Sequence, residues 1–182
     1  MKDVLTKALQ KDLNVAVYAN PSDTTKFAYG KLLCTDNENF AMYLISPDGE
    51  YDGILVQEIA AIQYLEISER YDRKINTLCA RHSMPEVHIP AAAEDVKTDV
   101  LLYAKAAGKI VAIEVNSSGL DDLTGCVEKV EGNICKIKQV DPFGNEDGIA
   151  FADINRITQI SCDSLNEQRI LYLYAQKQKQ AE

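Results

Sequence analysis

The chain of 182 residues contains no tryptophan and only five cysteines, and it has no apolar run that approaches the roughly 20 residues of a membrane-spanning helix. The cysteine count is odd and no Cys-x-x-Cys pair occurs, which argues against a zinc ribbon, a thioredoxin-like motif and a disulfide framework. We therefore expect small thiols that are buried or half-buried in a reducing cytoplasm. The cysteines are Cys34, Cys79, Cys126, Cys135 and Cys162.

Catalytic patterns are also missing. The two histidines, His82 and His88, lie in one stretch with two prolines, and neither a Gly-x-Ser-x-Gly elbow nor a Gly-x-Gly-x-x-Gly loop occurs. The first 13 residues contain acids and no continuous apolar segment, so they do not resemble a signal peptide. We expect a cytoplasmic chain without enzymatic activity, cofactor or metal.

Neither half of the chain is basic. The formal net charge is −9; residues 1–80 contain 12 acids and 8 bases, and residues 81–182 contain 16 acids and 11 bases. Proteins that bind nucleic acid gain most of their sequence-independent affinity when lysine and arginine neutralise phosphates. The charge balance therefore disfavours RNA as a partner, and the missing apolar span argues against a membrane.

What the sequence does contain is an internal repeat. The segments SPDGEYDGILVQEIAAI (46–62) and DPFGNEDGIAFADINRI (141–157) share the spacing P-x-G-x-x-D-G-I, followed by I-x-x-I. At a constant offset of 95 residues, Gly30 aligns with Gly125, and the alignment continues without a gap into the following helices. The matched positions are glycines and apolar residues, which turns and cores require. The two halves are therefore predicted to share a fold.

Each half has the same order of predicted elements: a helix, a strand, a loop, two long strands joined by a polar turn, two further strands and a closing helix. Gly30, inside the first long strand, predicts a bend or a close backbone approach. Ser68 is expected to cap the closing helix of the first half, and Glu69 to favour its first turn. We assign residues 1–80 to the first domain, 81–95 to a linker, and 96–182 to the second domain with its C-terminal helix.

Two pairs of segments resemble the motifs of the Sm-like (LSm/Hfq-like) proteins. FAYGKLLCTDNENFAMYLISPDG (27–49) and LTGCVEKVEGNICKIKQVDPFG (123–144) are similar to the first Sm motif, and DGILVQEIAAI and DGIAFADINRI are similar to the second. The resemblance implies a mainly β chain with flanking helices, built from two tandem five-stranded small barrels. Small barrels of the SH3 type share much of this pattern and are the main competing fold.

The family forms rings by pairing the last strand of one barrel with a strand of the next, and many members bind single-stranded RNA. Its polar turn commonly contains Asp and Asn, as does the turn at 36–39 here, but its Arg-Gly is replaced by Asp-Gly in both halves. The Lys-His of Hfq-like proteins is replaced by uncharged residues at 56–57 and 151–152. The candidate ligand-binding residues are Asn37, Asn39, Phe40, Tyr43, Asp52, Gly53, Asp147 and Gly148.

The repeated Asp-Gly pair has two interpretations. In the first, the glycine provides a positive φ in a tight connection and the aspartate accepts hydrogen bonds from the turn amides. In the second, Asp48, Asp52 and Asp147 form an acidic rim with Glu50 and Glu146 that attracts a cation or a basic peptide. A base-stacking site on Tyr29, Phe40 or Tyr43 would be confined to the first half.

Three functions remain open. The favoured one is a non-enzymatic interaction or assembly module that presents sheet edges to a protein partner or to further copies of itself. The second is an Sm-like protein that binds single-stranded RNA, and the third is a small hydrolase or metal-dependent enzyme with a site between the halves. The assembly is also open, either as a compact monomer or simple dimer, or as a ring of three chains.

Overall fold

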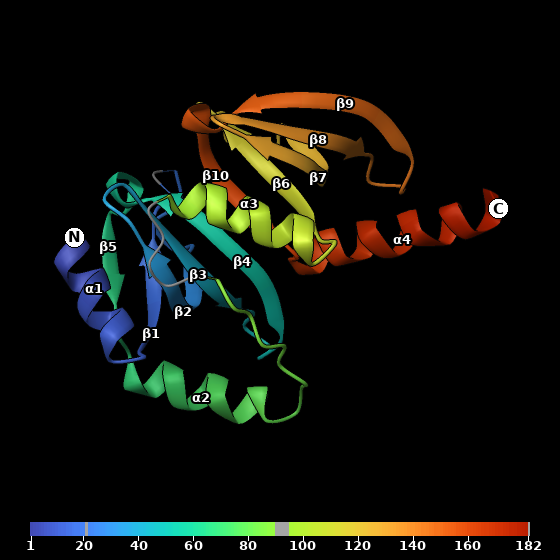
Figure 1. Cartoon of the computed structure of the whole chain (residues 1–182). Helices are drawn as coiled ribbons and strands as arrows, with labels where there is room; N and C mark the ends of the chain where they lie inside the picture. Colours follow the sequence, from blue (N-terminus) through green and yellow to red (C-terminus); the bar gives the residue numbers. More distant parts are fainter. Residues whose placement is uncertain (21, 90–94, 182) are drawn as a thin grey trace. The chain divides into compact units, whose positions relative to one another are not determined.

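The computed structural model describes residues 1–20, 22–89 and 95–181, and its chain divides into two compact units, Met1–Val96 and Lys97–Glu182 (Figure 1). Within the described residues, each unit contains a five-stranded antiparallel sheet with helices before and after it. The expected class, mainly β with flanking helices, is confirmed. Residues 90–94 of the predicted linker lie outside the described residues.

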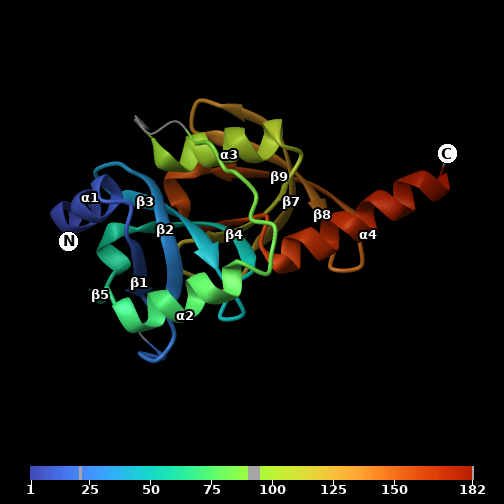
Figure 2. The same ribbon diagram turned by 90° about the horizontal axis from the view of Figure 1, so that it is seen from below.

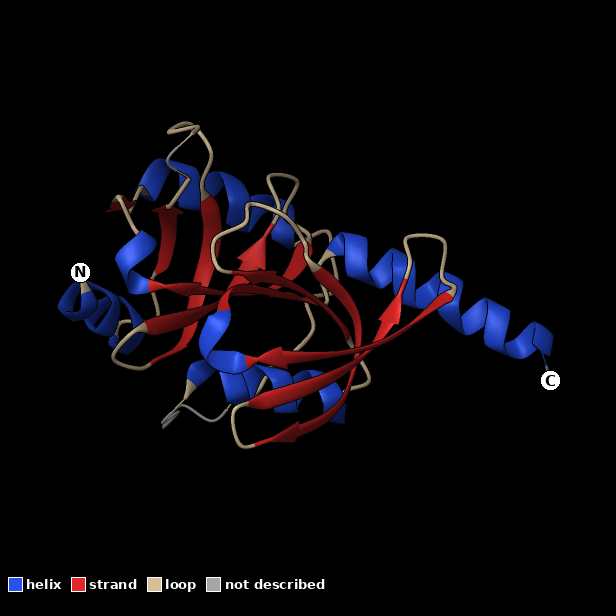
Figure 3. Ribbon diagram, turned by 90° about the horizontal axis from the view of Figure 1, so that it is seen from above, coloured by secondary structure: helices blue, strands red, loops and turns tan. Residues whose placement is uncertain are grey.

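The elements of the first unit follow the predicted order, and the strands curve along their length (Figure 3). A single-turn 3-10 helix, η1, separates the last two strands. The elements are α1 (Lys2–Gln10), β1 (Asn14–Tyr18), β2 (Ala28–Thr35), β3 (Asn39–Ile45), β4 (Tyr51–Glu58), η1 (Ile59–Ala61), β5 (Tyr64–Glu66) and α2 (Glu69–Cys79).

The second unit repeats this order of elements, and its closing helix is the longer of the two. Its first helix begins at Val96, the last residue of the first unit. The elements are α3 (Val96–Ala106), β6 (Ile110–Val115), β7 (Leu123–Glu131), β8 (Ile134–Val140), β9 (Glu146–Asp153), η2 (Ile154–Arg156), β10 (Ile157–Cys162) and α4 (Leu165–Ala181).

The two sheets have the same strand order and the same register. The order is β5-β1-β2-β3-β4 in the first unit and β10-β6-β7-β8-β9 in the second. Gly30 pairs with Leu44 and Gly125 pairs with Gln139, so both partners differ by the same 95 residues. The offset that aligns the sequences therefore also aligns the hydrogen-bonded ladders.

Neither sheet closes on itself, which corrects the expectation of two closed barrels. In the first unit, β5 pairs with β1 and lies at the opposite end of the strand order from β4. The 3-10 turn η1 redirects the chain after β4, and β5 is only three residues long. In the second unit, β10 likewise pairs with β6 and lies at the opposite end from β9. Each unit is thus a curved open sheet.

Gly30 lies where the backbone of the neighbouring strand comes very close. A Cβ built on Gly30 would lie 1.8 Å from the carbonyl oxygen of Tyr43 on the neighbouring strand, and one built on Gly125 would lie 2.0 Å from that of Lys138. Only a residue without a side chain fits at this distance. The prediction of a close approach at Gly30 is confirmed, and the second unit has the same contact.

Two helices cover different parts of the first sheet. The spacing of Leu5 and Ala8 places both on one face of α1, where they are buried against Val15, Phe40 and neighbouring apolar residues. The helix α2 crosses the sheet (Figure 2), and its Ile75 packs with residues that include Tyr29 and Ile45. Ser68 caps α2 by accepting a hydrogen bond from the Tyr71 amide, as predicted.

In the second unit, the closing helix packs against its own sheet in the same way. Ile170 of α4 is buried with Ile110 of β6 and Val140 of β8. All five cysteines are free thiols; three are buried and two are half-buried, as expected. Burial raises the pKa of the Cys135 thiol to about 11, so it stays protonated and unreactive at neutral pH.

Candidate binding sites

The polar turn between β2 and β3 is held by one carboxylate. Oδ1 of Asp36 accepts hydrogen bonds from the amides of Glu38 (2.7 Å) and Asn39 (2.6 Å), and Oδ2 accepts one from the amide of Val96 (2.9 Å). Burial raises the pKa of Asp36, but these hydrogen bonds outweigh it and the pKa is lowered overall. Asp36 therefore organises the turn with its own oxygens.

Most of the candidate ligand-binding residues in and after this turn are buried or half-buried. Asn37 is exposed, whereas Asn39 is only 5 % exposed and Phe40 is completely buried in the core beneath α1. Tyr43 is half-buried, and its hydroxyl donates a hydrogen bond to the carbonyl of Pro85 (3.3 Å). A base-stacking platform on Phe40 is therefore excluded by its burial, since no face of the ring reaches solvent.

The repeated Asp-Gly pairs lie in strands rather than in turns. Between its pairs with Ile45 and Tyr43, β4 has two residues, Asp52 and Gly53, where β3 has only one. The pair thus forms a β-bulge, and the same count holds for Asp147 and Gly148 in β9. Both glycines have the predicted positive φ, 84° and 89°. The expected tight connection is corrected to a bulge.

The hairpins that precede these bulges are held by other side chains. In the first unit, the hydroxyl of Ser46 accepts hydrogen bonds from the amides of Asp48 and Glu50. In the second, the carboxylate of Asp141 accepts them from the amides of Phe143 and Asn145. In each unit the hairpin before the bulge is thus held by the side chain at its first position, Ser46 or Asp141.

The structure does not bring the eight candidate residues together. Asn37 and Asn39 lie at the first end of β3, whereas Asp52 and Gly53 lie opposite its last residues. Asp147 and Gly148 belong to the other unit and are exposed on β9. Of the eight, Asp52 lines a pocket in the first unit.

Strand β9 is the most exposed strand in the second unit. It pairs with β8 and forms an end of the sheet, and its Ile149 and Phe151 are 53 % and 68 % exposed. Ile134 of β8 lies on the same face, opposite Asp153, and is 44 % exposed. We call Ile134, Ile149 and Phe151 the β9 patch. Large exposed apolar side chains on an edge strand and the strand next to it are a feature that native proteins usually cover.

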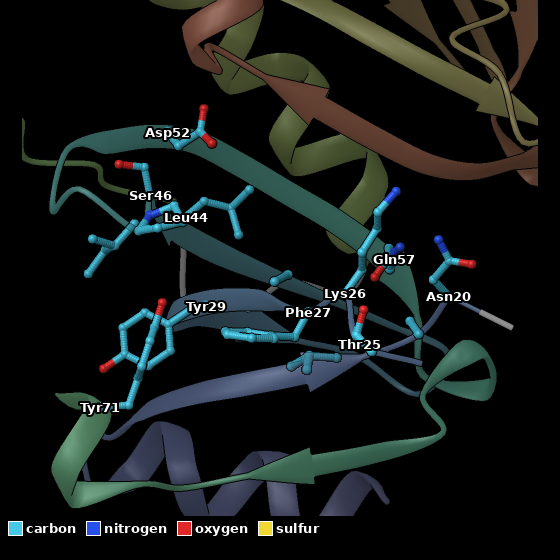
Figure 4. Close-up of a pocket in the computed structure, with 15 residues that line it drawn as sticks. Asn20, Thr25, Lys26, Phe27, Tyr29, Leu44, Ser46, Asp52, Gln57 and Tyr71 are labelled. Carbon is cyan, nitrogen blue, oxygen red and sulfur yellow. The ribbon is translucent and has the colours of Figure 1, made fainter. Parts of the chain in front are cut away.

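A pocket of about 500 Å³ opens in the first unit, within the size range of small-molecule sites (Figure 4). Its walls come from the β1–β2 connection, the end of β3, strand β4 and helix α2. Figure 4 shows Phe27 edge-on between Tyr29 and Lys26, across the pocket from Leu44, whereas the carboxylate of Asp52 points away from these rings. Aromatic rings thus form one wall, and an aliphatic side chain lies opposite them.

The aromatic wall is a connected cluster. The ring of Phe27 contacts Tyr18 (centroids 5.1 Å apart, tilted) and Tyr71 (5.6 Å, edge-on), and Tyr71 also contacts Tyr29 edge-on at 4.8 Å. Such geometries are the favourable ones for aromatic pairs. Burial, followed by the hydrogen bond to Glu66, raises the pKa of Tyr18 to about 12, and burial raises that of Tyr71. The phenols therefore stay neutral at physiological pH.

Sequence reasoning missed this pocket because its main residue is Phe27. Phe27 is 39 % exposed and lies just before β2, whereas the sequence predicts the start of a long strand there. A weak signal existed, since the tyrosines are concentrated in the first half, with six of the nine before residue 80. The sequence does not indicate that Tyr71 of α2 comes back to Phe27, because that contact depends on the packing of α2.

The histidines and possible metal ligands do not form a site in the part of the chain that the structure describes. His82 lies 3.7 Å from Glu50 and His88 lies 3.7 Å from Glu86, both at or near the surface. No group of three or more His, Cys, Asp or Glu side chains gathers there around a position for a metal ion. Met84, within the predicted linker, packs against the first sheet with Tyr29, Ile45 and Ile75.

Comparisons with known proteins do not assign the chain to a family. No described helix is both long enough and apolar enough to cross a membrane. No protein-family model, curated protein or solved structure matches the chain significantly.

Proposed function

We propose that the chain is a non-enzymatic assembly module in which two Sm-like units present sheet edges to further copies of the same chain. The two units have the order helix, five antiparallel strands, helix, and the strand order in which the fifth strand pairs with the first supports the Sm-like assignment. Strands β3 and β4 pair in the same register and with the same bulge as β8 and β9, which lie 95 residues later in the chain. This repetition supports a duplicated unit. Association is the function that such edges allow.

The observation on which the proposal rests is the β9 patch at the end of the second sheet. Ile149 and Phe151 are more than half exposed on a strand of eight residues that has an edge available for pairing. Phe143, in the hairpin before β9, is 73 % exposed. A partner strand added at this edge would satisfy backbone groups and cover these side chains together.

A second copy is favoured as partner because the two units have different edges. The first sheet ends at β5, a three-residue strand with the exposed side chain of Tyr64, and the second ends at the longer β9. Pairing of unlike edges is heterologous and forms rings or filaments, whereas a two-fold dimer would pair β9 with β9. Helix α4 reaches the start of β9, where the Tyr174 hydroxyl donates a hydrogen bond to Glu146 (2.7 Å), but Gly148, Ile149 and Phe151 remain exposed.

RNA binding is the weaker proposal on the same fold. The acidic balance of both halves opposes phosphate binding, and the first-motif turn uses Asp36 to hold its own amides. The aromatic ring next to that turn, Phe40, is buried. A nucleic acid that co-purifies with the chain, measured by the ratio of absorbance at the nucleic-acid and protein maxima, would reverse this ranking.

Light scattering of the eluting protein at micromolar concentration tests assembly. One chain has a mass of 20.2 kDa, so three chains (3 × 20.2) would give 60.6 kDa. We expect a mass above that of one chain, and we expect Phe151→Glu to return it to one chain. Glu at 151 faces Lys136 across the strand pair, so the sheet tolerates the new charge.

The matched control is Leu120→Glu. Leu120 is 69 % exposed in the loop before β7, outside the β9 patch, and the substitution adds the same charge. Assembly should survive Leu120→Glu. A mass of one chain for the unaltered protein at every concentration would contradict the proposal, as would equal loss of assembly in both variants.

A further inference from the structure

The β9 patch has a counterpart in the first unit that is almost completely covered. At the offset of 95 residues, the patch corresponds to Asn39, Ile54 and Val56. These counterparts are 5 %, 0 % and 0 % exposed, whereas every residue of the patch is more than 40 % exposed. The duplicated unit therefore covers this surface at one of its two occurrences and leaves it open at the other.

The first helix of each unit shows the opposite difference. Around the start of α1, Met1 is 47 % exposed, Lys2 is exposed and Thr6 is half-buried. Their counterparts at the start of α3 are 0 %, 7 % and 0 % exposed, and they are Val96, Lys97 and Leu101. Here the first unit has the open surface and the second unit has the covered one.

The open surface of α1 is distinct from the side that packs on the first sheet. Leu5 and Ala8 are the buried residues of the helix. Lys2 and Thr6 are four residues apart and therefore share a face. We call Met1, Lys2 and Thr6 the α1 stripe. The ammonium of Lys2 donates a hydrogen bond to the side chain of Asn37 at the surface, so the stripe is held next to the β2–β3 turn.

A chain does not cover its β9 patch with its own α1 stripe, because both surfaces are exposed in the same chain. Each chain therefore has one open patch and one open stripe. Contact between two unlike surfaces is heterologous and can continue from one copy to the next.

Charge favours α1 over a second β9 strand as the cover of the patch. Strand β9 contains the acids Glu146, Asp147 and Asp153 and no base. Pairing of β9 with β9 would bring these acids together from both copies, and like charges opposite one another destabilise a sheet. Helix α1 contains two lysines and one acid, and one of the lysines, Lys2, belongs to the stripe.

The lysines beside the patch do not cancel this acidic character. Lys136 lies 2.7 Å from Glu128 on the neighbouring strand, and Lys138 lies 3.5 Å from Glu146. Both lysines thus already have carboxylate partners within the second unit. Asp153, which lies opposite Ile134 of the patch, keeps one end of the patch acidic.

We propose that the α1 stripe of a second copy docks on the β9 patch, so that the chains associate head to tail. The inference rests on the proposed assembly function and names the partner surface. The side chain of Met1 and the methyl group of Thr6 would cover the apolar residues of the patch, and Lys2 would approach Asp153.

The first experiment measures the mass of Thr6→Glu by light scattering, under conditions in which the unaltered chain assembles. Glutamate is a better helix former than threonine, so α1 should persist, and the new charge should be repelled by the acids of β9. We expect the mass of one chain, 20.2 kDa. Thermal unfolding followed by circular dichroism shows that the variant is folded.

The matched control is Val4→Glu. Val4 is 47 % exposed and lies two residues from both Lys2 and Thr6, which places it on the other side of the helix. The substitution adds the same charge to the same helix outside the stripe. Assembly should survive it.

The second experiment mixes two variants that do not assemble alone. Phe151→Glu has a damaged patch and an intact stripe, and Thr6→Glu has the reverse. An equal mixture should form a pair of 40.4 kDa (2 × 20.2) that cannot grow, because its remaining two surfaces are both damaged. In a nuclear magnetic resonance spectrum of the mixture with only the Phe151→Glu chain labelled with nitrogen-15, amides of α1 should shift and those of β9 should not.

Several results would overturn the head-to-tail contact and leave assembly itself in place. If the unaltered chain assembles and Thr6→Glu does as well, the patch pairs with another surface, such as a second β9. A mixture that stays at the mass of one chain would exclude the α1 stripe, and so would shifts confined to residues 64–66 of β5. Equal disruption by Val4→Glu and Thr6→Glu would indicate a general effect of charge on α1. By contrast, a mass of one chain for the unaltered protein would contradict both this contact and the proposed function.

Discussion

Strands β4 and β9 are equivalent in register and differ in environment. Ile54 and Val56 of β4 are completely buried, whereas their counterparts Ile149 and Phe151 of β9 are 53 % and 68 % exposed. Both strands have the same bulge and the same pairing with the preceding strand. The shared apolar pattern thus specifies the strand and its register, but not whether the strand is covered.

The two units also differ in how they use aromatic residues. The first unit gathers Tyr18, Phe27, Tyr29 and Tyr71 around a pocket, and the second has hydrogen-bonding residues at the equivalent positions. The two units therefore share a backbone conformation but differ in the side chains on their surfaces.

The largest expected effect concerns the contact that the units share. Gly30→Ala and Gly125→Ala should each destabilise their unit by about 3 kcal/mol or more, because a Cβ at 1.8 or 2.0 Å from a backbone oxygen forces the strands apart. Urea unfolding measures the loss. Gly119→Ala is the control for backbone strain alone, since Gly119 has a positive φ of 77° but its Cβ would meet open space. Equal losses at Gly30 and Gly119 would contradict the close-approach argument.

A smaller effect is expected at the bulges, where the two units differ in burial. Gly53 and Gly148 both have positive φ, but Gly53 is buried and Gly148 is exposed. Gly53→Val should destabilise the protein by roughly 1 to 3 kcal/mol through backbone strain and crowding at a buried position. Gly148→Val has the same strain and should cost less, because its Cβ would meet open space. An unchanged thermal unfolding curve for Gly53→Val would refute this.

The element order could be predicted from the sequence because glycines and apolar spacing are local signals. Gly30 and Ser68 fulfil the predicted backbone roles, and the repeat predicts the second sheet from the first. The binding surfaces could not be predicted in the same way. Phe40 and Phe27 are both aromatic residues near strand ends, and only the packing of α1 and α2 buries one and leaves the other exposed.

Whether each sheet closes also depends on tertiary structure, namely on the direction that β5 or β10 takes. The sequence predicts two further strands after the long pair, and η1 is the break between them. The 3-10 turn η1 sets the direction of the next strand, β5. Strand β5 has only three residues, and among the described strands of its unit it pairs with β1 alone. Alternation of apolar residues gives no information about this direction.

The smallest expected effect distinguishes two acids at equivalent positions of the closing helices, Asp72 and Glu167 (72 + 95 = 167). The hydrogen bond from Asn14 is the largest influence on Asp72, and together with those from Tyr29 and Asn76 it lowers the pKa against the effect of burial. Burial dominates at Glu167, which is 3 % exposed, and raises its pKa despite hydrogen bonds from Ser164 and Ser161. The same helix position thus has opposite shifts.

The two shifts predict opposite dependences of stability on pH. The pKa of Asp72 is lower in the folded chain than its ordinary value of 3.8, so its stabilisation is present above pH 3.8 and is lost as the pH falls through the folded pKa. The pKa of Glu167 is higher in the folded chain than its ordinary 4.5, so folding incurs no cost from this group below pH 4.5 and an increasing cost as the pH rises through the folded pKa.

Urea unfolding between pH 3 and 7 measures both effects on the free energy of unfolding. Asp72→Asn should lose less stability than the unaltered chain as the pH falls, and Glu167→Gln should lose less stability as the pH rises above 4.5. Gln retains an acceptor for the Ser164 amide, so a parallel downward shift of the whole Glu167→Gln curve would instead assign Glu167 a capping role only.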